Sequence, residues 1–273
     1  MFRTDYIVPN AAVTIQKYMK TILKFALSIY LKAMARLALL IHRPKIIVVA
    51  GSANKIFIKE RIALELSLAG KTVKAAPRSF NTEIGLPVAI LSLPSGYGSY
   101  QAWLPIILRA PLAAIKNRLP DFLVLEFGIS KPGDMKFLLS IVKPDVAVIS
   151  DITQRYMDNF SSVEKLLDEY RRLLKNIKKG GTAILNSDNE KVKNLGAGRF
   201  AAKKIFFGFN DGADWRIMES SSRLEKQTAK ILAGDVEMTC EIGRPGRHQL
   251  YALLAGKIIG KIYGAKMGKS EKK

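Results

Sequence analysis

Cysteine and histidine are scarce in this sequence. Its 273 residues include one cysteine, Cys240, and two histidines, His42 and His248. A single cysteine excludes an intramolecular disulfide framework, and the three residues together fall short of the four ligands of a structural zinc site. We therefore expect no zinc cluster and a protein suited to a reducing, cytoplasmic setting.

Long apolar runs are absent as well. No segment approaches the ~20 consecutive apolar residues that a membrane-spanning helix requires. The N-terminus lacks the short charged start, apolar core and small-residue cleavage site of a secretory signal. From these two absences we expect neither a cleaved signal nor a helix that crosses a membrane.

Acidic residues are sparse at both ends of the chain. The formal net charge is +21, and residues 1–45 carry eight Lys and Arg against one acid, while residues 246–273 carry seven against one. Such an excess favours an anionic partner, which could be a nucleotide, a nucleic acid or an acidic lipid surface, although basic ends also simply keep a chain soluble. Nucleic acid is the weakest of these, because no interleaved aromatic and basic residues form a stacking motif.

The N-terminal stretch 13–41 contains no Gly or Pro and is predicted to form one amphipathic helix. We expect it to be the main part of a basic helical arm, residues 1–44. A helix with one basic and one apolar face can pack on its own domain, bind a partner protein, or lie on an anionic membrane surface. The basic face comprises Lys17, Lys20, Lys24, Lys32 and Arg36, and the apolar face comprises Ile15, Ile22, Leu23, Phe25, Ala26, Ile29, Tyr30, Ala33, Leu37 and Leu40.

From Lys45 onward, short apolar runs alternate with helical patterns. Near-continuous Val, Ile and Leu strands separated by helices indicate an α/β fold with a mostly parallel sheet covered on both faces. Ligands of such sheets bind at the carboxyl ends of the strands. The predicted strands are 45–50, 72–76, 122–128, 145–150, 181–186 and 203–209, and the predicted helices are 57–69, 132–142, 163–177 and 246–264. Residues 210–245 are predicted to form a small β-rich appendage, and 93–120 an inserted loop and helix.

The stretch VVAGSANKIFIKERIA, residues 48–63, is built like a phosphate-binding loop with two substitutions. An apolar strand leads into a small-residue turn, a lysine and a helix, as in loops that hold phosphates. However, Asn54 precedes Lys55 where such loops have glycine, and Ile56 follows it where they have a hydroxyl that binds magnesium. Asn54 tolerates a left-handed backbone, but Ile56 offers a hard cation no oxygen. Lys55 is therefore either a phosphate ligand or an ordinary solvated lysine at a helix start.

Six segments of the chain together carry a family resemblance. They are AGSANKIFIKE (50–60), NTEIGLP (81–87), LVLEFGISKPGDMKFLLSIVKPDVAVISDI (123–152), GTAILNSDN (181–189), FGFNDGAD (207–214) and GRHQLYALLAG (246–256). In this order they resemble the central ATP-binding domain of the Mur ligases, the amide ligases of peptidoglycan-precursor synthesis, and in particular the branch that adds D-alanyl-D-alanine. The resemblance implies a P-loop-like central domain over residues 45–264, followed by a basic tail, 265–273, without the family's N-terminal UDP-binding and C-terminal domains.

The resemblance also implies ATP and Mg²⁺ as cofactors and assigns site residues. Glu126 matches the magnesium-binding glutamate of the family. No catalytic set is intact, because the positions of four polar family residues are occupied here by Ile56, Tyr156, Tyr170 and Ala252. The implied nucleotide-binding residues are Gly51, Ser52, Ala53, Asn54, Lys55, Asn81, Asn186, Asp188 and His248.

These substitutions lead to three hypotheses on function. The first is a catalytically degenerate Mur ligase-like domain that acts as a binding or scaffold protein in peptidoglycan-precursor synthesis, cytoplasmic or peripheral at the inner face of the membrane. The second is an active ATP-dependent carboxylate-amine ligase, ADP-forming, or a nucleotide-binding subunit completed by a partner chain. The third is a basic nucleic-acid-binding protein, which would bind with a steep dependence on salt.

Overall fold

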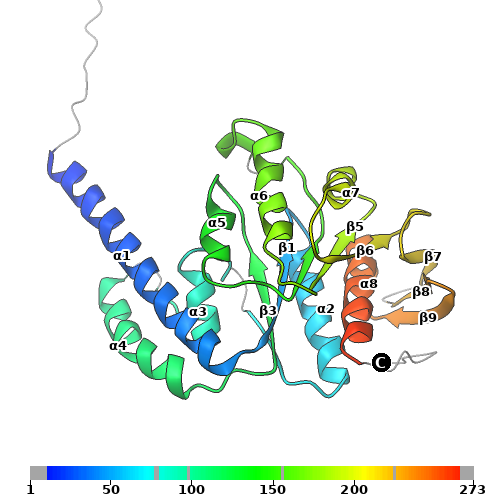
Figure 1. The fold of residues 1–273 in the computed structure, drawn as a ribbon, viewed down its shortest axis with the longest axis horizontal. Coiled ribbons are helices and arrows are strands. Elements are labelled where there is room, and N and C mark those ends of the chain that lie inside the picture. Colours follow the sequence, from blue (N-terminus) through cyan, green and yellow to red (C-terminus); the bar gives the residue numbers. More distant parts are fainter. Residues whose placement is uncertain (1–10, 77–79, 97–98, 155–156, 224–225, 265–273) are drawn as a thin grey trace, which may run out of the picture.

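A nine-stranded sheet forms the centre of the computed structural model, which describes residues 11–76, 80–96, 99–154, 157–223 and 226–264 (Figure 1). The strand order is β2-β3-β1-β4-β5-β6-β7-β8-β9, and all pairs up to β6 and β7 are parallel. The fold class predicted from the sequence is thereby confirmed. The strands of the parallel part are β1 (Lys45–Ala50), β2 (Val73–Ala75), β3 (Phe122–Phe127), β4 (Val146–Ile149), β5 (Thr182–Asn186) and β6 (Lys203–Gly208).

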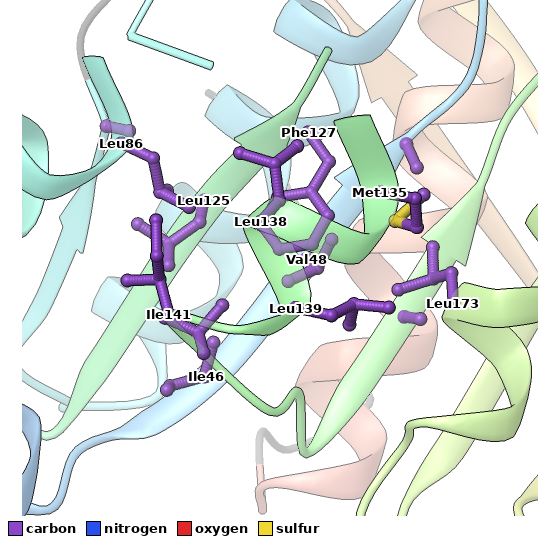
Figure 2. Close-up of a cluster of buried hydrophobic side chains, with 14 of the residues drawn as sticks. Ile46, Val48, Leu86, Leu125, Phe127, Met135, Leu138, Leu139, Ile141 and Leu173 are labelled. Atoms are coloured by element: carbon purple, nitrogen blue, oxygen red, sulfur yellow. The ribbon is translucent and has the colours of Figure 1, made fainter. Parts of the chain in front are cut away.

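Helices cover both faces of this sheet, because alternate residues of each buried strand point to opposite sides. On one face, Val48 and Leu125 join a core formed with α3, α5 and α6, part of which Figure 2 shows. On the other face, Ile47 and Val124 pack under α2 and α8. The helices are α2 (Lys55–Leu68), α3 (Gly85–Leu91), α5 (Asp134–Leu139), α6 (Val163–Lys175), α7 (Glu190–Ala197) and α8 (Arg247–Ile262), with a short 3₁₀ turn at Met157–Asn159.

The β-rich segment predicted after β6 extends the main sheet. β7 (Trp215–Arg223) pairs in parallel with β6, and β8 (Lys226–Ala233) and β9 (Val236–Ile242) follow as antiparallel hairpin strands. Alternate residues of β8, such as Ala229 and Ile231, are buried in the same core as α8. The antiparallel strands thus belong to the same packed body as the parallel sheet.

The N-terminal helix α1 (Ala11–His42) extends away from the sheet at its N-terminal end and packs on the body at its C-terminal end (Figure 1). The helix is as predicted, but its packed side is not the predicted apolar face. Leu31, Ala35 and Ala38 are buried against α3 and α4 (Tyr100–Lys116), whereas Ile22 and Phe25 are exposed. Among the described residues, the predicted apolar face of α1 is exposed over its N-terminal part, whereas Tyr30 and Leu37 farther along it pack against the core.

The count of consecutive apolar residues overlooked this helix as a candidate span. Within the described part of the chain, Tyr18–His42 is long and apolar enough to cross a membrane by length and composition. Our prediction counted uninterrupted apolar residues, whereas widely spaced lysines leave the average hydropathy high. A helix that passes this test need not span a bilayer, since buried core helices and signal sequences pass it as well.

Candidate functional site

The turn between β1 and α2 lies at the centre of the parallel sheet. Because β1 pairs with both β3 and β4, this turn lies between the carboxyl ends of those two strands. Gly51 has a φ of 140°, and a Cβ atom there would meet the Ser150 hydroxyl. Asn54 has a φ of 64°, the left-handed conformation expected of the glycine that it replaces. The shape of a phosphate-binding turn is thus retained.

The Asn54 side chain is held by the neighbouring strand. Its Nδ2 donates to Asp151 Oδ2 at 2.8 Å, and Ser150 Oγ donates to the Ala53 carbonyl at 2.6 Å. The same carboxylate, through Oδ1, accepts a hydrogen bond from Asn186 Nδ2 at 3.1 Å. Asp151 was not among the predicted site residues, although its place just after β4 is the kind of position at which site residues of such sheets lie.

Lys55 is not a solvated lysine. Its Nζ donates to the Gly51 carbonyl at 2.8 Å and lies 3.8 Å from Glu126 Oε1, with its side chain largely buried. The ammonium therefore lies across the turn that forms the candidate cradle. α2 has no side-chain cap at its N-terminus, and the first N–H groups of a helix attract anions.

Glu126, the implied magnesium ligand, is bound by amine and amide groups of the protein. Its Oε1 accepts a hydrogen bond from Asn81 Nδ2 at 3.0 Å, and its Oε2 lies 3.5 Å from Nζ of Lys59. Lys59 is only 2% exposed, and sequence reasoning missed it. The signal was available, because a residue four positions after Lys55 lies on the same face of the helix.

These residues do not fit a magnesium ion. Mg²⁺ requires octahedral oxygen ligands, but the carboxylate of Glu126 is already paired with Lys59 and Lys55, and Ile56 supplies no hydroxyl. Among the described residues, no group of three or more His, Cys, Asp or Glu side chains could hold a metal ion. The charge that a divalent cation would neutralise is instead neutralised by lysine.

Tyr170, which occupies one of the four substituted family positions, is 2% exposed in the core beneath the turn. Burial raises the pKa of its hydroxyl to about 12, against a hydrogen bond with Ser52 that lowers it. Ser52 Oγ in turn accepts a hydrogen bond from the Thr153 N–H at 3.0 Å. Tyr170 therefore supports the turn from inside as a neutral phenol. Tyr156, the other aromatic replacement, lies outside the described residues.

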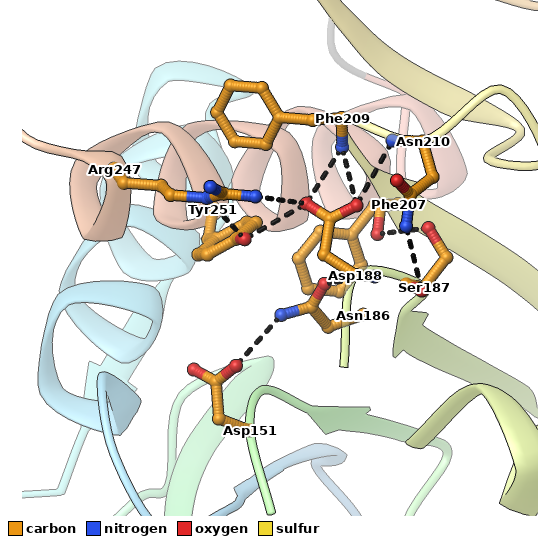
Figure 3. A network of polar contacts seen from close by, with 9 residues as sticks. All are labelled: Asp151, Asn186, Ser187, Asp188, Phe207, Phe209, Asn210, Arg247 and Tyr251. Atoms are coloured by element: carbon orange, nitrogen blue, oxygen red, sulfur yellow. Dashed lines mark hydrogen bonds and ion pairs between the residues drawn. The ribbon is translucent and has the colours of Figure 1, made fainter. Parts of the chain in front are cut away.

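Asp188 and Asn186, predicted to contact a nucleoside, belong to a network at the end of β5 (Figure 3). Asp188 accepts hydrogen bonds from the backbone N–H groups of Phe209 at 2.9 Å and Asn210 at 3.0 Å, and from the Tyr251 hydroxyl at 2.9 Å. Its Oδ2 also lies 3.3 Å from Nη2 of Arg247. This carboxylate ties α8 to the loop after β6.

The remaining predicted residue, His248, does not join either group. Its ring lies 4.5 Å from the ring of Phe57, near the start of α2. The structure therefore places Gly51, Lys55, Asn81 and Glu126 together, links Asn186 to Asn54 through Asp151, and leaves His248 against an aromatic side chain.

A pocket of about 730 Å³ adjoins the turn. Gly51, Lys55 and Asn81 line one side, and the loop after β3 lines another. Part of the wall comes from α1, through Lys24 and Phe25, and Lys24 forms a 2.8 Å ion pair with Glu83 of the 81–83 loop. The basic N-terminal helix thus contributes directly to the space beside Lys55.

The family model of the Mur ligase middle domain matches residues 104–260, more than half of the chain. The chain belongs to the Mur ligase family. The UDP-N-acetylmuramoyl-tripeptide–D-alanyl-D-alanine ligase of Escherichia coli (strain K12) is 23% identical over 225 residues, which are 81% of this chain and 44% of that protein. The corresponding ligase of Mycobacterium leprae is 31% identical over 147 residues, 54% of this chain and 24% of that protein.

Solved Mur ligases share the fold. MurF ligase from Thermotoga maritima, in complex with ADP, has a TM-score of 0.71 at 21% identity and covers 98% of this chain and 54% of its own. MurF from Acinetobacter baumannii has a TM-score of 0.70 at 16% identity, covering 87% and 47%. This Mur ligase-family chain thus spans about half the length of the relatives that it matches.

The carboxyl group of Asp151 gives the site a pH dependence. Burial is the largest influence and raises its pKa above the ordinary 3.8, while hydrogen bonds from Asn54 and Asn186 act in the opposite direction. Because the native state holds this proton more tightly than the unfolded chain, the contribution of Asp151 to stability is complete below pH 3.8. It is lost as the pH rises through the native pKa.

We therefore expect Asp151→Asn to gain stability relative to the unsubstituted protein as the pH increases from 3.8, until Asp151 is fully ionised. The measurement is urea unfolding of both proteins across this range, because the difference between them isolates the one carboxyl group. A constant difference at every pH would show that Asp151 titrates equally in the folded and unfolded chains.

Proposed function

We propose that this Mur ligase-family chain binds a nucleotide, or another anion that carries phosphate, at the turn 51–54 and has lost the metal-dependent chemistry of an amide ligase. It then acts as a binding or scaffold protein in peptidoglycan-precursor synthesis. The retained left-handed turn, the uncapped start of α2 and the ammonium of Lys55 support anion binding. The ADP complex of the Thermotoga maritima ligase supports a nucleotide as the anion.

The observation that carries this proposal is the pairing of Glu126 with Lys59 and Lys55. Acyl-phosphate formation needs a concentrated positive charge that neutralises the transferring phosphoryl group. In this chain the carboxylate that would hold such a cation has two lysines as counter-charges, and one of them is buried. A phosphate group can approach Lys55 without a metal, but it meets no metal-bound centre that promotes transfer.

We expect the affinity for a fluorescent ADP analogue to be the same in Mg²⁺ and in EDTA, within about twofold. Lys55→Ala should weaken binding by at least about tenfold, because it removes the ammonium that faces the turn. Lys193→Ala, on the exposed side of α7, removes the same charge elsewhere and should leave the affinity unchanged. Fluorescence anisotropy measures all three.

The other outcomes separate the alternatives. Magnesium-dependent binding that Lys55→Ala abolishes would overturn the metal-independent site and favour an active ligase or a subunit completed by a partner chain. The pocket beside Lys55, which has room for a second ligand, is the feature that supports that alternative. Failure to bind the analogue under either condition would contradict nucleotide binding itself.

A further inference from the structure

The helix α1 presents a wide apolar face that its own domain leaves uncovered. Ile22 and Phe25 are each 65% exposed, and large apolar side chains are exposed along the helix up to Leu40 and Ile41. At about 100° per residue, Ile22, Ile29 and Leu40 lie on the side opposite the buried residues Leu31, Ala35 and Ala38. The exposed large apolar side chains of the described part of α1 are Tyr18, Met19, Ile22, Leu23, Phe25, Ile29, Leu40 and Ile41.

The neighbouring helix α4 has a similar uncovered stripe. Tyr30 of α1 donates its hydroxyl hydrogen to the Ile107 carbonyl of α4 at 2.8 Å, so the two helices lie side by side. At helical spacing along α4, the side chains of Leu104, Leu108, Leu112 and Ile115 are exposed, with Leu108 at 71%. Large exposed apolar patches are rare on monomeric proteins and mark interaction surfaces.

The charged side chains of these two helices are all basic. No Asp or Glu occurs between residues 6 and 59, or between residues 84 and 120. Exposed basic side chains in or beside the two helices include Arg36, Arg43, Arg109 and Lys116. A second copy of this chain would bring these like charges together, which disfavours a symmetric dimer through this surface.

We propose that the exposed apolar stripes of α1 and α4 dock this chain on an anionic phospholipid bilayer. Apolar side chains enter the boundary between headgroups and acyl chains, while the basic residues attract anionic headgroups. α1 lies in this interface and does not span the bilayer. Its C-terminal half is packed on the body, and the 16 residues from Ala11 to Ala26 extend only about 24 Å at 1.5 Å per residue, short of a hydrocarbon core of ~30 Å.

Sedimentation of the full chain with vesicles tests this proposal. We expect binding to vesicles of phosphatidylcholine with phosphatidylglycerol, binding at least about tenfold weaker to phosphatidylcholine alone, and release in alkaline carbonate. The triple variant Ile22→Gln, Phe25→Gln, Ile29→Gln should lose at least about tenfold in affinity, because it removes three apolar groups from the centre of the face.

The matched control is Leu64→Gln, Leu68→Gln, Val236→Gln, which replaces three exposed apolar residues outside α1 and α4 and should bind as the unsubstituted chain does. Circular dichroism checks that both triple variants are folded. Equal binding to both kinds of vesicle, resistance to carbonate, or equal loss in both variants would overturn the proposal. A dimer of the unsubstituted protein in light scattering would also overturn the proposal if the variant Ile22→Gln, Phe25→Gln, Ile29→Gln were monomeric. A second copy of the chain would then occupy the face. None of these results depends on nucleotide binding.

Discussion

Replacement of Lys59 with methionine is expected to lower the free energy of unfolding by about 3 kcal/mol, because it leaves a mostly buried carboxylate without its nearest cation. The Lys59 and Glu126 side chains are 3% and 11% exposed, and their charged atoms are 3.5 Å apart. Methionine retains much of the side-chain volume, so the loss reports mainly the charge. Urea unfolding with linear extrapolation measures it.

Two further variants make this prediction specific. Lys45→Met removes a lysine at the same distance, 3.5 Å, from Asp145, but that lysine side chain is 59% exposed, so we expect a change within about 0.5 kcal/mol. Glu126→Gln should partly rescue Lys59→Met, since the double variant no longer holds a carboxylate that lacks its nearest cation, while Lys55 keeps its hydrogen bond to the Gly51 carbonyl. If the two single effects simply add, the lysine and the carboxylate are not coupled and the cation does not act through Glu126.

The Lys59–Glu126 pair also connects the fold to the proposed function. In a parallel sheet, side chains at the carboxyl ends of neighbouring strands converge on one edge, and here β1 and β3 bring the turn and Glu126 together. At that edge a ligand must replace existing partners. A phosphate has to draw Lys55 from the Gly51 carbonyl, whereas a divalent cation has to displace two ammonium groups from one carboxylate. The first exchange leaves the ion pair between Lys59 and Glu126 intact. The second leaves two ammonium groups without their carboxylate.

Much of the fold could be predicted because local and long-range preferences agree. Runs such as KIIVVA and FLVLEF are apolar on both sides, which is typical of buried strands in a parallel sheet. The left-handed turn at Asn54 was also predictable, since few residues other than glycine adopt it readily. The contact partners of these elements required the structure, because sequence spacing does not fix which face of a helix meets the sheet.

The helix α1 shows why. Its hydrophobic periodicity predicted an apolar face, and the helix has that face. The side that packs against α3 and α4, however, includes small residues such as Ala35 and Ala38. In the site, Lys59 escaped notice for a similar reason. A lysine inside a helix is usually solvated, and only the tertiary position of Glu126 identifies it as a buried counter-charge. The sequence thus showed that metal-binding residue types were missing from the site. It did not show that Lys59 supplies the counter-charge to Glu126.

Asp188→Ala is expected to destabilise the protein by about 3 kcal/mol, because it removes the buried acceptor that four donors share, and two of these donors are partly buried. The carboxylate is 5% exposed and accepts from two backbone N–H groups, from the Tyr251 hydroxyl and from Arg247. The network is local to the end of β5, so the loss should be accompanied by faster amide hydrogen exchange at Phe209 and Asn210.

Asp211→Ala is the matched control. Asp211 lies in the loop after β6, its side chain is 96% exposed, and it forms a surface ion pair with Arg216. It should change stability by no more than about 0.5 kcal/mol. Asp188 should also matter little for the lysine–glutamate pair, since the two groups share no partner, so Asp188→Ala and Lys59→Met are expected to be additive. A small effect of Asp188→Ala, similar to that of Asp211→Ala, would mean that its carboxylate is not required to hold α8. Asp188 would then remain available to contact a nucleoside, as the resemblance to the Mur ligases first implied.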